Sequence, residues 1–222
     1  MKDSLLAERW AAAFLTTVQD VEQRSGVTAD QWRVGGRRTK ANPDGETLEY
    51  WQSEGLRQVE EYLSWLADTG WRIATMPDGR PGVEWDAEVN FGGTPIRAVV
   101  DCIYTNGSDL IVVDYKTGSR TPSGVTQLGL YASVVERAHG VRPQYGGFYM
   151  TRAARLDDLV DLTPWGMDFF DYSFGAMNAQ LATGFFAPNV SDHCSWCNVR
   201  DYCYAVNGPK SDQYPLQIQE GK

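Results

Sequence analysis

Apolar positions along the chain follow two periods, and together these predict an α/β fold. Between Leu5 and Val21 they recur at steps of three and four residues, which is typical of an amphipathic helix, and Gly26 ends this pattern. The same period predicts a second helix over 47–69. Between 83 and 91 apolar and polar residues alternate strictly, as in a half-buried strand. Helices therefore precede a sheet.

The middle of the chain predicts an antiparallel meander. Gly92–Gly93 turns the first strand into a second over 96–102, and Asn106–Gly107 turns that strand into a third that begins at Ile111. A loop over 117–124 follows. The remaining predicted elements are a helix over 125–138, a strand over 145–151, a short partner strand over 159–162 and a helix from Thr163–Pro164 to about Gly184.

The second helix carries two distinct faces. Its apolar positions predict a buried side made of Leu48, Trp51, Leu56, Val59, Leu63 and Leu66. Glu54, Gln58 and Glu61 are spaced by four and three residues, so they share another face. Such a polar stripe usually faces water. If it meets the end of the sheet instead, one of its members can enter a functional site.

The most informative stretch is the third strand, Ile111 to Gly118, where an apolar run contains Asp114 and Lys116. Side chains alternate along a strand, so these two point to one face while Val113 and Tyr115 point to the other. A buried acid and base are costly unless they pair or bind an ion. A structural ion pair would explain them alone. With Asp101 at the end of the neighbouring strand, they could also hold a divalent cation and a water against a phosphodiester.

The helix after this strand adds two polar side chains. Gln127 and Tyr131 are four residues apart, so they stack on one helix face. Because the loop before them is short, that face can cover the strand end with Asp114 and Lys116. The chain thus presents, in order, an acid on one strand, D-x-K on the next and Q-x-x-x-Y on the following helix.

This order and spacing resemble the RecB-like branch of the PD-(D/E)XK nucleases. The resemblance implies a restriction-endonuclease-like core, in which helices flank a central mixed β-sheet. It implies that Asp101, Asp114 and the carbonyl of Tyr115 bind Mg²⁺ or Mn²⁺, and that Lys116 orients or activates the attacking water. Carboxylate oxygens suit Mg²⁺, which keeps several waters for chemistry. Gln127 and Tyr131 would then position the substrate strand and support the lysine.

Two further acids are candidates through the same resemblance. The family usually has a histidine on the helix before the sheet, but the histidines here are His139 and His193, downstream of the core motifs. Glu54 is the first candidate for that place, ahead of Gln58 and Glu61 on the same helix. Glu88 matches an acidic position on the family's first strand. It is equally well explained as an exposed polar position on an alternating strand.

Three cysteines, Cys194, Cys197 and Cys203, crowd near the end of the chain. In a cytoplasmic protein such clustering favours a metal over disulfides. The triplet resembles the C-terminal cysteines of RecB-like nucleases with a [4Fe–4S] cluster, which implies a structural clamp. The fourth cysteine, Cys102, follows Asp101 on a strand and is expected to face the core. A non-cysteine fourth ligand for iron–sulfur, or Zn²⁺ held with His193, are the alternatives.

The composition of the chain limits the kinds of partner that it can bind. The 222 residues carry a net charge of -9, which argues against passive nucleic-acid binding through a basic surface. Arg33, Arg37, Arg38 and Lys40 gather in a polar loop over 30–45, which is either solvated or a DNA contact. The apolar runs are too short and too charged for a membrane span, and the first residues do not read as a signal peptide. We expect a cytoplasmic protein of a bacterium or a phage-infected cell.

The sequence as a whole predicts a nuclease domain over 1–184, a cysteine-rich metal-binding segment packed on it over 185–207, and a flexible tail over 208–222. The resemblance implies a metal-dependent DNA exonuclease in phage or bacterial recombination or replication, acting on DNA ends that are single-stranded or carry single-stranded tails. Alternatives are a DNA-end processing module of a larger assembly, such as CRISPR adaptation, and a cysteine-clamped protein with a vestigial site. A second copy of the chain or a recombination protein could be a partner.

Overall fold

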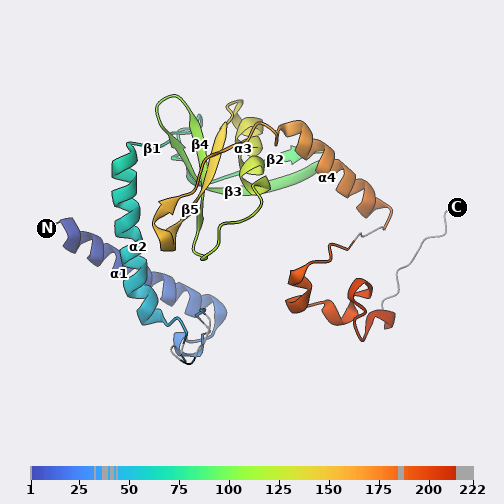
Figure 1. The fold of residues 1–222 in the computed structure, drawn as a ribbon, viewed down its shortest axis with the longest axis horizontal. Helices are drawn as coiled ribbons and strands as arrows, with labels where there is room; N and C mark the ends of the chain where they lie inside the picture. The colour runs from blue at the N-terminus through green and yellow to red at the C-terminus, as the bar shows by residue number, and fades with distance from the viewer. Residues whose placement is uncertain are drawn as a thin grey trace.

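The computed structural model of the chain describes residues 2–32, 34–36, 40, 43, 45–184 and 188–213, and it contains a central sheet between helices (Figure 1). The helices are α1 (Lys2–Ser25), α2 (Leu48–Thr69), α3 (Thr126–His139) and α4 (Met167–Ala182). The strands are β1 (Arg72–Ile73), β2 (Val83–Phe91), β3 (Thr94–Thr105), β4 (Leu110–Lys116), β5 (Tyr145–Met150), β6 (Arg155–Leu156) and β7 (Val160–Asp161). Short 3₁₀ helices lie at Ala29–Gln31, Thr151–Ala153, Asp192–Trp196, Arg200–Tyr202, Tyr204–Val206 and Ser211–Gln213.

The sheet is mixed, with its strands in the order β1-β3-β4-β5-β6, while β2 pairs with β3 and β7 pairs with β5. β2, β3 and β4 form the predicted antiparallel meander. β5 runs parallel to β4, because α3 carries the chain back across the sheet before β5 begins. The predicted α/β class, in which helices flank a central mixed sheet, is confirmed. No helix among the described residues is long and apolar enough to cross a bilayer.

One face of the sheet packs against α3 and α4 and forms the larger core. Val112 of β4 and Leu128 of α3 are fully buried there, and Phe170 of α4 and Phe91 of β2 extend the same cluster. Burying a side chain of this size stabilises the fold by about 1.5–3 kcal/mol. This core therefore fixes α3 on the sheet and, with it, the helix face that carries Gln127.

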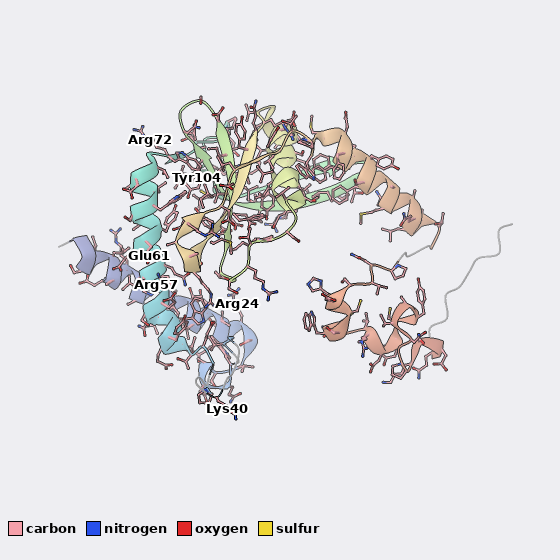
Figure 2. All side chains as sticks on the ribbon, in the orientation of Figure 1. Arg24, Lys40, Arg57, Glu61, Arg72 and Tyr104 are labelled. Atoms are coloured by element: carbon pink, nitrogen blue, oxygen red, sulfur yellow. The ribbon has the colours of Figure 1, made fainter. Side chains whose placement is uncertain are left out.

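The other face packs against α2 through aromatic side chains. Tyr62 and Trp65 of α2 lie against Tyr104, Tyr115 and Tyr149 of the sheet, with ring centroids 4.8–6.0 Å apart. Figure 2 shows Tyr104 in the sheet beside α2. The hydroxyls of Tyr62 and Tyr104 lie 2.7 Å apart, and Tyr104 also bonds the hydroxyl of Tyr115. These mutual bonds satisfy phenol groups that burial would otherwise leave unpaired.

The predicted buried side of α2 is confirmed in part. Leu66 packs against the aromatic core, whereas Leu63 is 44% exposed and the buried positions are Gly55 and Gln58. α1 covers the helix at Gly55, where a Cβ would lie 2.2 Å from the ring of Trp10. Trp10 also donates from Nε1 to the carbonyl of Gln52 at 2.6 Å.

The last helix also begins later than predicted. Thr163 and Pro164 lie in a turn, where the amide of Thr163 donates to Asp161 Oδ1 at 2.8 Å, and α4 starts only after Gly166. The short strands β1 and β6 were not predicted, because two residues carry no periodic signal. Of the predicted basic loop, Lys40 is described and exposed, whereas Arg33, Arg37 and Arg38 lie outside the described residues.

The segment 188–213 consists of 3₁₀ turns and lies beyond the end of α4, apart from the sheet in Figure 1. Trp196 is 74% exposed and Val199 is 63% exposed. α4 ends at Ala182, and the predicted division of the chain at residue 184 stays a prediction.

α4 is held to the sheet at the turn between β2 and β3. Gly92 has a φ of +56°, and a Cβ there would lie 2.2 Å from the carbonyl oxygen of Asp171. The Asp171 carboxylate accepts the Gly92 amide at 2.8 Å and pairs with Arg137 of α3 at 2.5 Å. The turn, α3 and α4 therefore meet where only a glycine fits.

We expect Gly92→Ala to destabilise the protein more than Gly140→Ala. Both glycines have a positive φ, which costs other residues about 1–2 kcal/mol, but Gly140 has open space around it. Overlap with α4 should add about 1–3 kcal/mol at Gly92. Urea denaturation of the two variants measures the difference, and equal losses would show that α4 does not press on this turn.

Candidate active site

The D-x-K strand carries its two charged side chains on the face that packs against α3. Val112 lies in the core with α3, whereas Val113 and Tyr115 lie in the aromatic core with α2, so Asp114 and Lys116 alternate toward α3 as predicted. The Asp114 side chain is 2% exposed, and its Oδ2 lies 2.5 Å from Lys116 Nζ. Lys116 is 28% exposed, so the ion pair opens to solvent on the lysine side.

Asp101 reaches the same place because β3 and β4 separate there. Their pairing extends to Cys102 opposite Val113, and beyond that point Asp101 Oδ2 accepts the backbone amide of Tyr115 at 2.9 Å. The carboxylate thus replaces a strand carbonyl as the partner of β4. Sequence reasoning placed Asp101 beside Asp114, and the structure adds the bond that holds it.

The backbone opposite Asp101 is irregular. In β2 the neighbouring pairs are Val83 with Cys102 and Trp85 with Val100, and Glu84 between them has a φ of +44°. Across this irregularity the side-chain direction changes: Trp85 packs in the core with α3, while Val83 lines a cavity on the α2 side. The left-handed conformation at a non-glycine residue is strained, and such strain is common at functional sites.

The two carboxylates repel each other. Burial raises the pKa of Asp114, and the negative charge of Asp101 raises this pKa further, while Lys116 opposes both effects. A cation bridging the carboxylates would relieve the repulsion and offset the desolvation of Asp114. The donor set is therefore chemically suited to a hard divalent cation.

A chain of hydrogen bonds links this pair to α3. Lys116 Nζ donates to Gln127 Oε1 at 3.1 Å, and Gln127 Nε2 donates to the hydroxyl of Tyr131 at 2.9 Å. Burial raises the pKa of Tyr131, and the charges of Asp114 and Asp101 add to the shift, so the phenol stays protonated at neutral pH. The structure brings together five of the predicted residues: Asp101, Asp114, Lys116, Gln127 and Tyr131.

Thr151 and Arg152, which follow β5 and were not predicted as site residues, hold the end of β4. Thr151 Oγ1 donates to the carbonyl of Lys116 at 3.3 Å, and Arg152 Nε donates to the carbonyl of Thr117 at 2.6 Å. Arg152 also pairs with Glu46 at 2.9 Å and lies over the ring of Trp51 at 4.8 Å. The available signal was their place at the end of the strand predicted over 145–151.

Glu54 and Glu88 are not brought to this group. Glu54 lies on α2, where it accepts from Arg57 and Gln58, and the bond from Arg57 lowers its pKa to about 2. Figure 2 shows Arg57 and Glu61 side by side along this helix. Glu88 is exposed on β2 and faces Arg97 across the ladder. Their roles in metal binding remain predictions.

The described residues contain no group of three His, Cys, Asp or Glu side chains placed to hold a metal ion. Cys194 accepts the amide of Ser191, Cys197 is exposed, and Cys203 lies between two 3₁₀ turns, each with a free thiol. Cys102 is buried under α2 in the aromatic core, as its place on the strand predicted. The predicted iron–sulfur cluster and the alternative zinc site therefore find no support among the described residues.

Comparison with known proteins gives a consistent result. A family model described as the PD-(D/E)XK nuclease superfamily matches residues 5–204. The "Gene 69 protein" of Mycobacterium phage D29 is 32% identical over 155 residues, covering 67% of this chain and 57% of that protein. The protein of the same name from Mycobacterium phage L5 is 28% identical over 174 residues, covering 67% and 60%. The chain thus spans less than two thirds of the length of these relatives.

Among solved structures, the one titled "Crystal structure of SSO0001" aligns with a TM-score of 0.39 at 14% identity, covering 71% of this chain and 78% of that one.

The hydrogen bond between Asp101 and the Tyr115 amide can be tested without measuring enzymatic activity. Asp101→Ala should accelerate hydrogen exchange at the Tyr115 amide by about tenfold or more, because one hydrogen bond to a charged acceptor contributes about 1.5–3 kcal/mol. Asp101→Asn keeps an acceptor oxygen and should retain much of the protection. The amide of Val112, inside the paired part of β4, is the internal control. Unchanged exchange at Tyr115 in Asp101→Ala would contradict this role.

Proposed function

Because the chain belongs to the PD-(D/E)XK nuclease superfamily, we propose that it is a metal-dependent deoxyribonuclease that hydrolyses phosphodiester bonds at DNA ends. The observation that carries the proposal is the meeting of Asp101 and Asp114 where β3 and β4 separate, with Lys116 paired to Asp114. Phosphodiester hydrolysis needs a positioned water and compensation for charge that develops on the phosphate. Two acids and one lysine at a solvent-facing strand end can meet both needs.

Asp101, Asp114 and the backbone carbonyl of Tyr115 would hold the metal, with Mg²⁺ or Mn²⁺ as the expected ion. The fit rests on two carboxylates that share a site although burial and mutual repulsion disfavour the charge on Asp114. A bound divalent ion supplies Lewis-acid polarisation of the phosphate and lowers the pKa of a coordinated water. Glu54 and Glu88 stay in the proposal only as more distant acids.

Lys116 has two roles open to it. In the present arrangement its ammonium neutralises Asp114 and donates to Gln127. Since the side chain is partly exposed, the same ammonium can donate to a water or to a phosphate oxygen at the site entrance. Gln127 and Tyr131 fix the lysine from the α3 side, and we propose that Tyr131 also donates its phenol proton in a hydrogen bond to the substrate strand.

We further propose that the chain acts as an exonuclease in phage recombination or replication. The mycobacteriophage relatives support the phage setting, and their printed names do not state an activity. A DNA-end processing module of a larger assembly is the second candidate, supported by the exposed apolar side chains of segment 188–213, among them Trp196 and Val199. A vestigial site is disfavoured because five predicted site residues occur in one connected group.

The test is cleavage of labelled linear and circular DNA with Mg²⁺, with Mn²⁺ and with neither. An exonuclease degrades the linear form and spares the covalently closed circle, and chelation stops the reaction. Asp114→Asn and Lys116→Ala should each lower the rate by at least about 100-fold, because each removes a group that acts on the reacting phosphate or its water.

Asp158→Asn is the matched control, since this acid is exposed between β6 and β7. Each variant is compared with wild type by circular dichroism and thermal melting, so that loss of folding is separated from loss of chemistry. Wild-type rates in both pure site variants would refute the assignment. Cleavage of the circle at the rate of the linear form would replace exonuclease with endonuclease.

A further inference from the structure

A cavity of about 550 Å³ lies between α2 and the sheet, on the face opposite Asp114. Its walls are mainly aromatic: Trp10 of α1, Trp51 and Tyr62 of α2, and Tyr115 and Tyr149 of the sheet line it. Ile73 and Val83 also line it and are 40% and 42% exposed, so the cavity opens to solvent at their end. It is large enough for flat ring systems and offers ring faces to them.

One polar group of the cavity wall is open to an occupant. Gln58 is 7% exposed and its amide donates to Glu54, which leaves its carbonyl oxygen with capacity to accept. The hydroxyl of Tyr149 has no hydrogen-bond partner among the described residues, but it is fully buried and is not reached from the cavity.

The cavity is adjacent to the candidate active site through β4. Tyr115 and Thr117 line the cavity, while Asp114 and Lys116, which alternate with them, face α3. Thr151 lines the cavity and binds the carbonyl of Lys116. The end of β4 thus separates the aromatic cavity from the Asp114–Lys116 ion pair. Residues that line the cavity and residues that carry the charges follow one another directly along β4, at roughly 3.3 Å per residue.

We propose that this cavity binds an unstacked base of a single-stranded DNA end whose backbone passes the Asp101–Asp114 site. The proposal deepens the proposed function and rests on it for the identity of the substrate. A nucleobase combines a flat ring, which stacks on Trp or Tyr, with donors at its edge, which the Gln58 carbonyl complements. A lipid chain would leave this carbonyl unpaired. Double-stranded DNA cannot enter, because its bases are stacked and paired.

The charge of the protein favours DNA binding through the bases over binding through the phosphates. The cations beside the cavity, Arg57 and Arg152, are already paired with carboxylates, and the net charge is -9. Binding through phosphates alone would therefore be weak, and ring stacking must supply much of the affinity. Two arginines and Lys116 at most would release about three counterions, so the slope of log K against log salt should be about -2.1 or shallower.

The experiment measures binding without cleavage. A fluorescent single-stranded oligonucleotide is titrated with the whole chain in the presence of a chelator, beside a strand of equal length and charge that has abasic sites. We expect the normal strand to bind more tightly. Trp51→Leu keeps an apolar side chain but removes the ring, and it should weaken binding of the normal strand between about fivefold and 150-fold, the range for loss of one stack.

Two matched variants accompany this change. Trp51→Phe restores a ring and should bind within about threefold of wild type. Trp196→Ala removes an exposed tryptophan of segment 188–213 and should leave binding unchanged. All variants are compared by thermal melting.

Equal binding of normal and abasic strands by the wild type would overturn the proposal, as would Trp51→Leu binding like wild type. A steep salt slope or full competition by a mononucleotide would also refute it, since the first indicates phosphate binding and the second a free-nucleotide site. Because the measurement is made without metal, base binding can persist when cleavage is absent. The proposed nuclease activity and the base site can therefore fail separately.

Discussion

The separation of β3 from β4 at Asp101 determines how the rest of the site is arranged. Had the ladder continued, a backbone carbonyl would bind the Tyr115 amide and no carboxylate could stand beside Asp114. Instead the Asp101 side chain takes that amide, so the acid is fixed by a bond to the very strand that carries its partner. The strained backbone of Glu84, opposite Asp101, accommodates the change of side-chain direction. The site is thus a consequence of a local break in pairing, which the two flanking cores stabilise.

The two cores give the two faces of β4 different side chains. The α3 face holds Asp114 and Lys116 within a short series of hydrogen bonds that ends at Tyr131. The α2 face holds tyrosine hydroxyls that satisfy one another and an aromatic cavity. Arg152 connects the two by binding the chain just after Lys116 and by lying over Trp51 of α2. Charge and apolar surface therefore remain separate although they share a strand.

Much of this could be read from the sequence where periodicity is strong. The alternation of β2 and the order acid, D-x-K, Q-x-x-x-Y predicted the strands and the five grouped residues. The orientation of α2 could be predicted only in part, because Gly55 allows Trp10 to cover part of its apolar face while Gln58 of the polar stripe lines the aromatic cavity. Thr163–Pro164 has the composition of a helix start but forms a turn closed by Asp161. Thr151 and Arg152 act through backbone carbonyls, which leave no mark in the spacing of side chains.

The two faces of β4 also differ in where their residues come from. The charged face is built by one continuous stretch, 101–131, which folds as a meander with its following helix. The aromatic face depends on Trp10 and Trp51, which lie far upstream in α1 and α2. Substitutions in those first two helices that keep Trp51 under Arg152 can therefore accumulate without disturbing the carboxylates. In evolutionary terms, the fold allows the aromatic cavity to diversify while the charged residues are inherited unchanged.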